Sequence, residues 1–274
     1  MFLRRAFNSY ILVGVGAVLA MLFSYVTVTG YTLEVLGSFS TFFAFALICT
    51  SLIKLGVSNL ILKEAGRDSW SSNEIFWYGQ LLLLKNLVVV GGPLLLAAYL
   101  FELDDSVILF VTVILMVYFD FSVIICRAFS SPNLATFFES CIRPGILLLL
   151  LGFDLYYRLD IILILIVPLS YLISLALIII KVVSMSKADT NPISVVRARL
   201  FVTSFSSTNL SLGLVNIASL SFQNIFILVS ETVAGLAAAG LIKIAFQFGS
   251  LINLSSVAVN NLFSSDISRL FHSY

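Results

Sequence analysis

The chain has 274 residues, 60% of them hydrophobic, and a mean hydropathy of +1.11, which is more apolar material than a soluble domain of this size can bury. Its 15 basic and 14 acidic residues nearly cancel, so the net charge of +1 gives no indication of nucleic-acid binding. Composition therefore excludes an ordinary soluble domain and indicates a membrane protein.

Eight apolar windows follow one another, each compatible with the roughly 20 residues that a helix needs to cross a bilayer core. They are Tyr10–Val28, Leu36–Leu62, Ile75–Phe101, Val107–Cys126, Leu134–Phe153, Ile161–Ile180, Leu210–Leu228 and Val233–Val259. The fifth window takes Glu139 and Arg143 into its cytoplasmic end, and we include it because the charge distribution requires it. The predicted fold is an all-α, polytopic helical membrane protein with eight transmembrane helices.

Basic residues between the windows fall almost entirely on one side of the predicted membrane. With a cytoplasmic amino terminus, only Arg158 lies outside, which satisfies the positive-inside rule and places both termini in the cytoplasm. The first window lacks a cleavage pattern, so we expect it to remain as the first helix of a bacterial inner-membrane protein. The basic residues assigned to the cytoplasmic side are Arg4, Arg5, Lys63, Arg67, Arg127, Arg143, Lys181, Lys187, Arg197, Arg199 and Arg269.

The longest polar interval divides the windows into six and two. We predict a first six-helix bundle over residues 1–185, a cytoplasmic linker over 186–204, and the first two helices of an incomplete second bundle over 205–274. A short echo favours this division, because Ser51, Leu52, Ile53 and Leu55 recur as Ser250, Leu251, Ile252 and Leu254.

Charged residues within apolar windows are candidate functional residues, because an ionisable group at membrane depth is costly. Lys85 and Lys243 each lie ten residues into a window, about 15 Å deep at 1.5 Å per residue. Lys54 is shallower, so it either extends to the headgroups or faces a cavity. Asp120 lies two helical turns before Arg127, and the two either balance each other or flank a vestibule.

Glu139 and Arg143 have the i, i+4 spacing of a surface ion pair, which we favour over a binding role. The alternative is that Arg127 and Arg143 meet a pyrophosphate, since guanidinium groups match phosphate oxygens in bidentate geometry.

Polar side chains recur at helical spacing in the last two windows. Such stripes either hold helices together or offer hydrogen bonds to a ligand. The stripe residues are Asn209, Gly213, Asn216, Ser219 and Gln223 in the seventh window, and Lys243, Gln247 and Ser250 in the eighth.

Enzymatic chemistry is not expected from this sequence. It contains no nucleophile motif, phosphate-binding glycine loop or metal-ligand spacing, and its three cysteines form no disulfide framework. We therefore predict neither a catalytic residue nor a metal or cofactor.

Three stretches resemble polysaccharide flippases of the multidrug/oligosaccharidyl-lipid/polysaccharide exporter superfamily, and together the resemblance covers nearly the whole chain. Residues 33–64 look like the second helix of those proteins, with Leu36-Gly37-Ser38-Phe39, the run from Ser51 to Asn59, and Lys63-Glu64. Arg127-Ala128-Phe129 with Asn133, Ala135, Phe138, Glu139 and Arg143 resembles their junction of helices four and five. Asn260-Asn261-Leu262-Phe263 and residues 266–271 resemble the end of their eighth helix.

The resemblance implies translocation of undecaprenyl-pyrophosphate-linked oligosaccharide units for O-antigen or capsule synthesis, by alternating access through a cationic cavity between two bundles. Membrane lipid, a polysaccharide polymerase and a chain-length regulator are the expected partners. Asp120 is the candidate ion-coupling residue. The candidate substrate-binding residues are Lys54, Lys85, Lys243, Arg127, Arg143, Asn216, Gln223 and Gln247.

Two other functions remain open. One is an exporter of drugs or organic cations from the related extrusion branch, although three intramembrane lysines against one aspartate favour anionic cargo. The other is an inactive remnant or assembly partner. Relatives continue after the eighth helix, so we expect either a truncated chain or a small protein completed by another copy.

Overall fold

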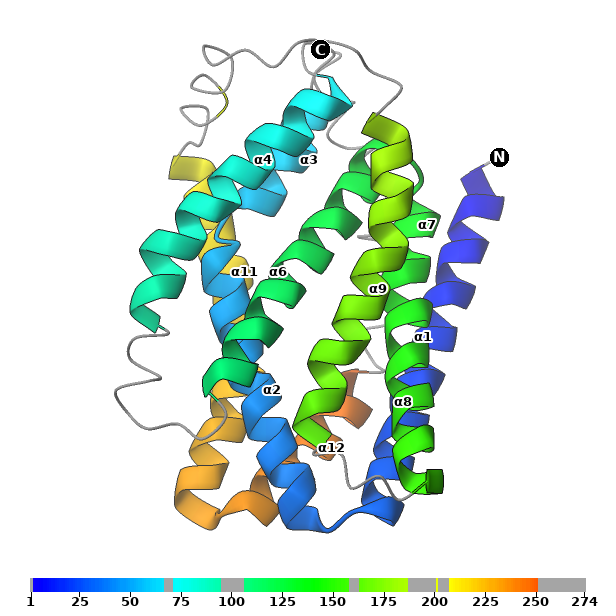
Figure 1. Cartoon of the computed structure of the whole chain (residues 1–274), viewed down its shortest axis with the longest axis vertical. Coiled ribbons are helices and arrows are strands. Elements are labelled where there is room, and N and C mark those ends of the chain that lie inside the picture. Colours follow the sequence, from blue (N-terminus) through cyan, green and yellow to red (C-terminus); the bar gives the residue numbers. More distant parts are fainter. Residues whose placement is uncertain are drawn as a thin grey trace.

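The computed structural model describes residues 2–66, 71–94, 106–157, 163–186, 201 and 207–250, and these are almost entirely helical, with no strand among them. The helices form a bundle in which successive long helices run in opposite directions (Figure 1). An all-α membrane protein was predicted, and the all-α class is confirmed for the described residues. The helices are α1 (Phe2–Gly30), α2 (Leu33–Ile53), α3 (Val57–Ala65), α4 (Ser72–Asn86), α6 (Ser106–Phe129), α7 (Pro132–Phe137), α8 (Arg143–Tyr157), α9 (Leu163–Ser186), α11 (Ser207–Ala234) and α12 (Leu236–Ser250).

Six of the eight expected spans are long and apolar enough to cross a membrane. They are Phe7–Gly30, Leu33–Ile53, Ser72–Leu94, Ser106–Phe129, Pro132–Tyr157 and Leu163–Val183. The last two windows correspond to α11 and α12, but neither is among these six. Helix α12 covers 15 residues, about 22 Å at 1.5 Å per residue, and the rest of its window lies outside the described residues.

Two of the spans contain a π-helical turn. The turn η1 (Leu87–Gly91) continues α4 directly before Gly92 and Pro93, and η2 (Phe138–Ile142) joins α7 to α8. Each π turn adds one residue to a helical turn, so it rotates the side chains that follow.

Local signals explain where several helices begin. The Thr32 side chain accepts a hydrogen bond from the Val35 N–H at the start of α2. Ser71 and Glu74 form a capping box at the start of α4, and Pro132 stands in the first turn of α7. The hydrogen bonds of Thr32, Ser71 and Glu74 satisfy N–H groups that have no partner within the helix, and Pro132 has no N–H that needs one.

The second span is not the continuous helix that the window Leu36–Leu62 predicted. It breaks between α2 and α3, where Gly56 has a φ of 70°, a conformation that residues with a Cβ rarely adopt. The Asn86 side chain donates to the Ile53 carbonyl at 3.0 Å and so satisfies a backbone group next to the break. The break separates the apolar helix α2 from the short amphipathic segment α3.

The core lies among the first six spans and has a small extension onto α11 and α12. Tyr78, Met116, Phe119 and Phe121 are fully buried in the main cluster, whereas many apolar side chains are exposed on the outside of the bundle, as a lipid-facing surface requires. A separate cluster joins α2 to the last two helices through Ala44, Ile227 and Ala239.

Helices α11 and α12 both pack against α2. The approach of α12 is close, because a Cβ on Gly37 would lie 1.8 Å from the Leu236 carbonyl oxygen. Most of the predicted linker at 186–204 lies outside the described residues, so the division into 1–185, 186–204 and 205–274 stays a prediction.

Candidate functional site

A cavity of about 250 Å³ lies between helices α1, α2, α8 and α9 on one side and α11 and α12 on the other. Helices α1, α2, α8, α9, α11 and α12 all contribute to its wall. Much of that wall is aromatic, with Phe23, Phe39, Phe43 and Phe246 among the lining residues. The rings of Phe39 and Phe43 stack with centroids 6.0 Å apart, which gives the cavity a rigid apolar side on α2.

Two cations line this cavity from opposite parts of the chain. Arg143 comes from α8 and Lys243 from α12, and both are half-buried. The ammonium of Lys243 lies 5.2 Å from the centroid of the Phe43 ring, a cation–π contact. Within the described part of the chain, neither cation forms an ion pair with a carboxylate.

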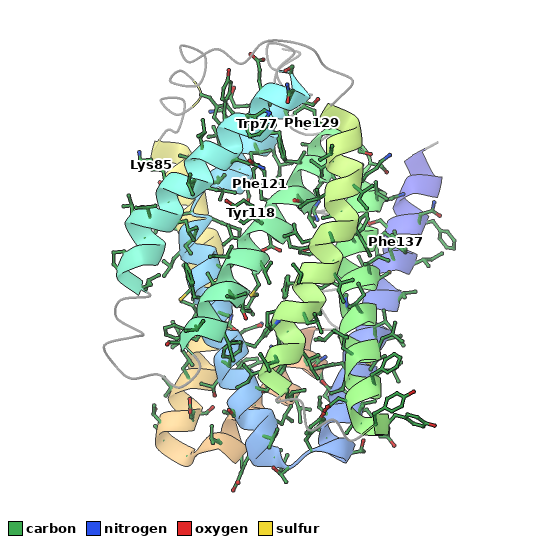
Figure 2. All side chains as sticks on the ribbon, in the orientation of Figure 1. Trp77, Lys85, Tyr118, Phe121, Phe129 and Phe137 are labelled. Atoms are coloured by element: carbon green, nitrogen blue, oxygen red, sulfur yellow. The ribbon has the colours of Figure 1, made fainter. Side chains whose placement is uncertain are left out.

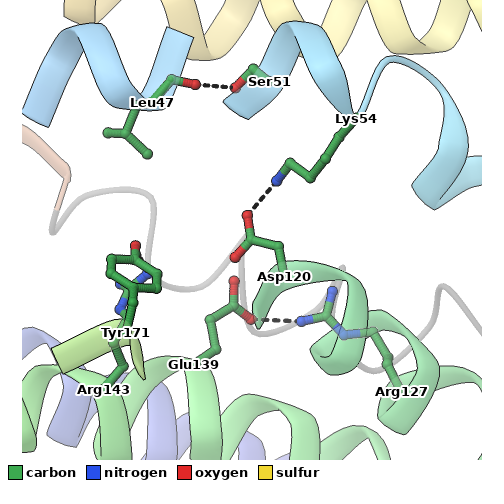
Figure 3. Close-up of polar contacts among 8 residues, drawn as sticks. All are labelled: Leu47, Ser51, Lys54, Asp120, Arg127, Glu139, Arg143 and Tyr171. Atoms are coloured by element: carbon green, nitrogen blue, oxygen red, sulfur yellow. Dashed lines mark hydrogen bonds and ion pairs between the residues drawn. The ribbon is translucent and has the colours of Figure 1, made fainter. Parts of the chain in front are cut away.

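Arg143 lies deeper than the sequence predicted. The span Pro132–Tyr157 places it eleven residues from the start (143 − 132), about 17 Å at 1.5 Å per residue, and not near the end of the helix. Its Nη1 donates to the Tyr171 hydroxyl at 2.8 Å, and its Cζ lies 5.3 Å from the centroid of that ring (Figure 3). The guanidinium is therefore held at the cavity wall by a residue that was not among the predicted site residues.

The polar stripes of the last two windows reach the same cavity in part. Gln223 and Gln247 both line it. Gln247 also connects α12 to α1, since its Oε1 accepts from the Ser24 hydroxyl and its Nε2 donates to the Ala20 carbonyl at 2.5 Å. The side chain of Asn216 lies outside the described side chains.

Lys54 does not line the cavity. It follows the last residue of α2 and forms an ion pair with the Asp120 carboxylate on α6 (Figure 3). Their side chains are 19% and 26% exposed. Lys54 therefore neither extends to the headgroups nor faces the cavity, which were the two roles left open for it. Asp120 is paired with Lys54 and not with Arg127.

The expected surface pair of Glu139 and Arg143 is wrong. Glu139 instead accepts from Arg127 Nη2 at 2.7 Å, which ties η2 to α6. The physical reason is the π turn between the two residues, which rotates Arg143 away from the direction that an i, i+4 spacing gives in an α-helix. Arg127 is thus occupied by a carboxylate and does not reach the cavity.

Lys85 also departs from its predicted position. It is exposed on α4 and lies at the outer edge of the bundle (Figure 2), and it is not among the residues that line the cavity. The expectation that it faces the bundle interior is wrong for this structure. Depth along a window was the only signal used, and depth does not specify which side of a helix a residue occupies.

Comparisons with protein-family models, curated proteins and solved structures find no match for this chain. The resemblance to flippases therefore depends on the residues quoted above. What the structure adds is the placement of Arg143, Lys243, Gln223 and Gln247 around one cavity.

Proposed function

We propose that the chain translocates an undecaprenyl-pyrophosphate-linked oligosaccharide across a bacterial inner membrane, with the cavity receiving the anionic headgroup. The observation that carries this proposal is the pair of half-buried cations, Arg143 and Lys243, which line one cavity without a carboxylate partner among the described residues. Unpaired charges at membrane depth are costly, and a phosphate between them would offset that cost.

The size of the cavity defines which part of the cargo it receives. At about 250 Å³ it is slightly smaller than the roughly 300–1,000 Å³ of typical ligand pockets. It fits the pyrophosphate and part of the first sugar but not a whole oligosaccharide. The remaining sugars require a more open state of an alternating-access cycle, while the polyprenyl chain stays in lipid.

The charge of the wall also separates this proposal from export of organic cations. Arg143 and Lys243 would repel a cationic drug, and no acidic residue lines the cavity within the described part of the chain. The aromatic wall suits either cargo, and the two cations favour an anion. Further elements of the proposal are ion coupling at Asp120, cytoplasmic termini, and cooperation with a polymerase and a chain-length regulator.

The direct test is transport of a fluorescent lipid-linked oligosaccharide by the full chain in proteoliposomes. Arg143→Ala and Lys243→Ala should each lower the flipping rate by about tenfold to a hundredfold, the range for losing a charged hydrogen bond of about 1.5–3 kcal/mol. Lys85→Ala is the matched control, because it removes an exposed lysine on another face, and it should leave the rate unchanged. If all three variants flip the lipid at the rate of the unaltered protein, the proposal is wrong.

A further inference from the structure

The orientation of Arg143 decides how it can meet an anion. A guanidinium presents its five N–H donors in a planar fork, so it binds an oxyanion strongly only when the fork faces it. One donor, on Nη1, is used by the Tyr171 hydroxyl at 2.8 Å, and this is the only hydrogen bond of Arg143 to another described side chain. The other donors remain for a ligand in the cavity.

Tyr171 lines the same cavity, but the packing of its ring in the core holds it in place. Its side chain is 2% exposed, and its ring packs edge-on against Phe119 of α6, with centroids 5.5 Å apart and planes at 83°. Phe119 is itself fully buried in the main core. The close packing of α6 on α9 therefore fixes where the Tyr171 hydroxyl lies, and the hydroxyl in turn fixes one end of the guanidinium.

We propose that Tyr171 is the positioning residue of the anion site: its hydroxyl, anchored by Phe119, directs the Arg143 guanidinium towards the headgroup. This inference rests on the proposed function, because it assumes that the cavity binds an anion. The hydroxyl is the essential part, since the ring alone would attract the cation without specifying its rotation.

The test measures binding of farnesyl pyrophosphate, a short polyprenyl pyrophosphate, to the full chain in detergent by titration calorimetry. Tyr171→Phe keeps the ring and its packing on Phe119 but removes the hydroxyl, and it should weaken binding about tenfold. Tyr156→Phe removes an exposed hydroxyl from α8 and should change nothing. A Tyr171→Phe variant that binds within twofold of the unaltered protein would overturn the inference.

A double-mutant cycle distinguishes positioning from any other effect of the hydroxyl. Arg143→Lys keeps the charge but loses the fork, so Tyr171→Phe added to Arg143→Lys should weaken binding by less than twofold more. If the fold-losses of binding in the two single variants multiply in the double variant, Tyr171 acts independently of Arg143, and the inference fails. If Tyr171→Phe does not accumulate, Phe119→Leu, which loosens the ring but keeps the hydroxyl, should still weaken binding several-fold, and unchanged binding would overturn the inference.

The same titration distinguishes a failure of this inference from a failure of the proposed function. Loss of binding in Arg143→Ala and Lys243→Ala together with normal binding in Tyr171→Phe would overturn only the positioning role. Normal binding in all of them, or no binding to the unaltered protein, would overturn both. Farnesol, which lacks the pyrophosphate, should bind at least tenfold more weakly than farnesyl pyrophosphate.

Discussion

Lys54 and Asp120 form an ion pair that joins the break in the second span to the middle of α6. Both side chains are mostly shielded, at 19% and 26% exposed. Removing either partner leaves the other charge in a poorly solvated position, whereas removing both does not. The pair therefore stabilises the position of the break through charge compensation.

Lys54→Met or Asp120→Asn should each destabilise the protein by about 3 kcal/mol, the lower end of the range for breaking a buried pair. The double variant should recover most of that loss. Thermal denaturation in detergent measures all three, and Lys85→Met, at an exposed lysine, should match the unaltered protein. Additive losses in the double variant would show that the two charges do not compensate each other.

Asp120 is also the candidate residue for coupling transport to an ion gradient. If an ion that enters at Asp120 displaces Lys54 and frees the break, Asp120→Asn should carry out transport that no longer responds to an imposed gradient. Flipping should be measured in proteoliposomes with a proton gradient and, separately, with a sodium gradient. A variant that still responds to either gradient as the unaltered protein does would place coupling elsewhere.

The close approach of α2 and α12 predicts a steric effect at Gly37. A Cβ there would lie 1.8 Å from the Leu236 carbonyl oxygen, so Gly37→Ala must force the helices apart, at a cost of about 1–3 kcal/mol for overpacking. Gly14→Ala is the control, because nothing lies within 4 Å of a Cβ at that position of α1. Melting temperatures should fall only for Gly37→Ala, and a fall of equal size in both would contradict the contact.

Neighbouring residues of α11 should differ in their access to water. Both residues are exposed, but Gln223 lines the cavity, whereas Phe222 packs on Phe226 on the apolar outside of the helix. In a variant without Cys49, Cys126 and Cys141, a sulfonate thiol reagent should label Gln223→Cys at least tenfold faster than Phe222→Cys. Mass spectrometry of the membrane-embedded protein follows the labelling, and equal rates would mean that the cavity is dry.

Hydrophobic length predicted the spans better than it predicted their interiors. Six of the predicted windows contain helices that are long and apolar enough to cross a membrane, although the second helix ends at Ile53, well before the end of its window at Leu62. The break at Gly56 was missed, since a single glycine in an apolar run does not by itself indicate a left-handed backbone. The π turn at Phe138–Ile142 was also missed, because apolar spacing does not indicate where a helical turn takes an extra residue, and this turn redirected Arg143.

For the site, depth and helical spacing were only partly informative. They selected Lys243, Gln223 and Gln247, which line the cavity, but also Lys85, which faces outward. Tyr171 could not be selected, because a single tyrosine in an apolar window matches packing as well as binding. The role that we propose for it depends on the pairing of α8 with α9 and on Phe119 of α6, which are contacts between residues distant in sequence.

The break in the second span also joins two distant parts of the chain mechanically. A Cβ on Gly213 of α11 would lie 2.5 Å from the Gly56 nitrogen, so the two backbones meet there with no side chain between them. A tilt of α3 towards α11 would displace that helix directly, because no flexible side chain separates the two backbones at this contact. Helix α11 also carries Gln223, which lines the cavity. Bending at Gly56 would therefore move α11, and with it the cavity wall.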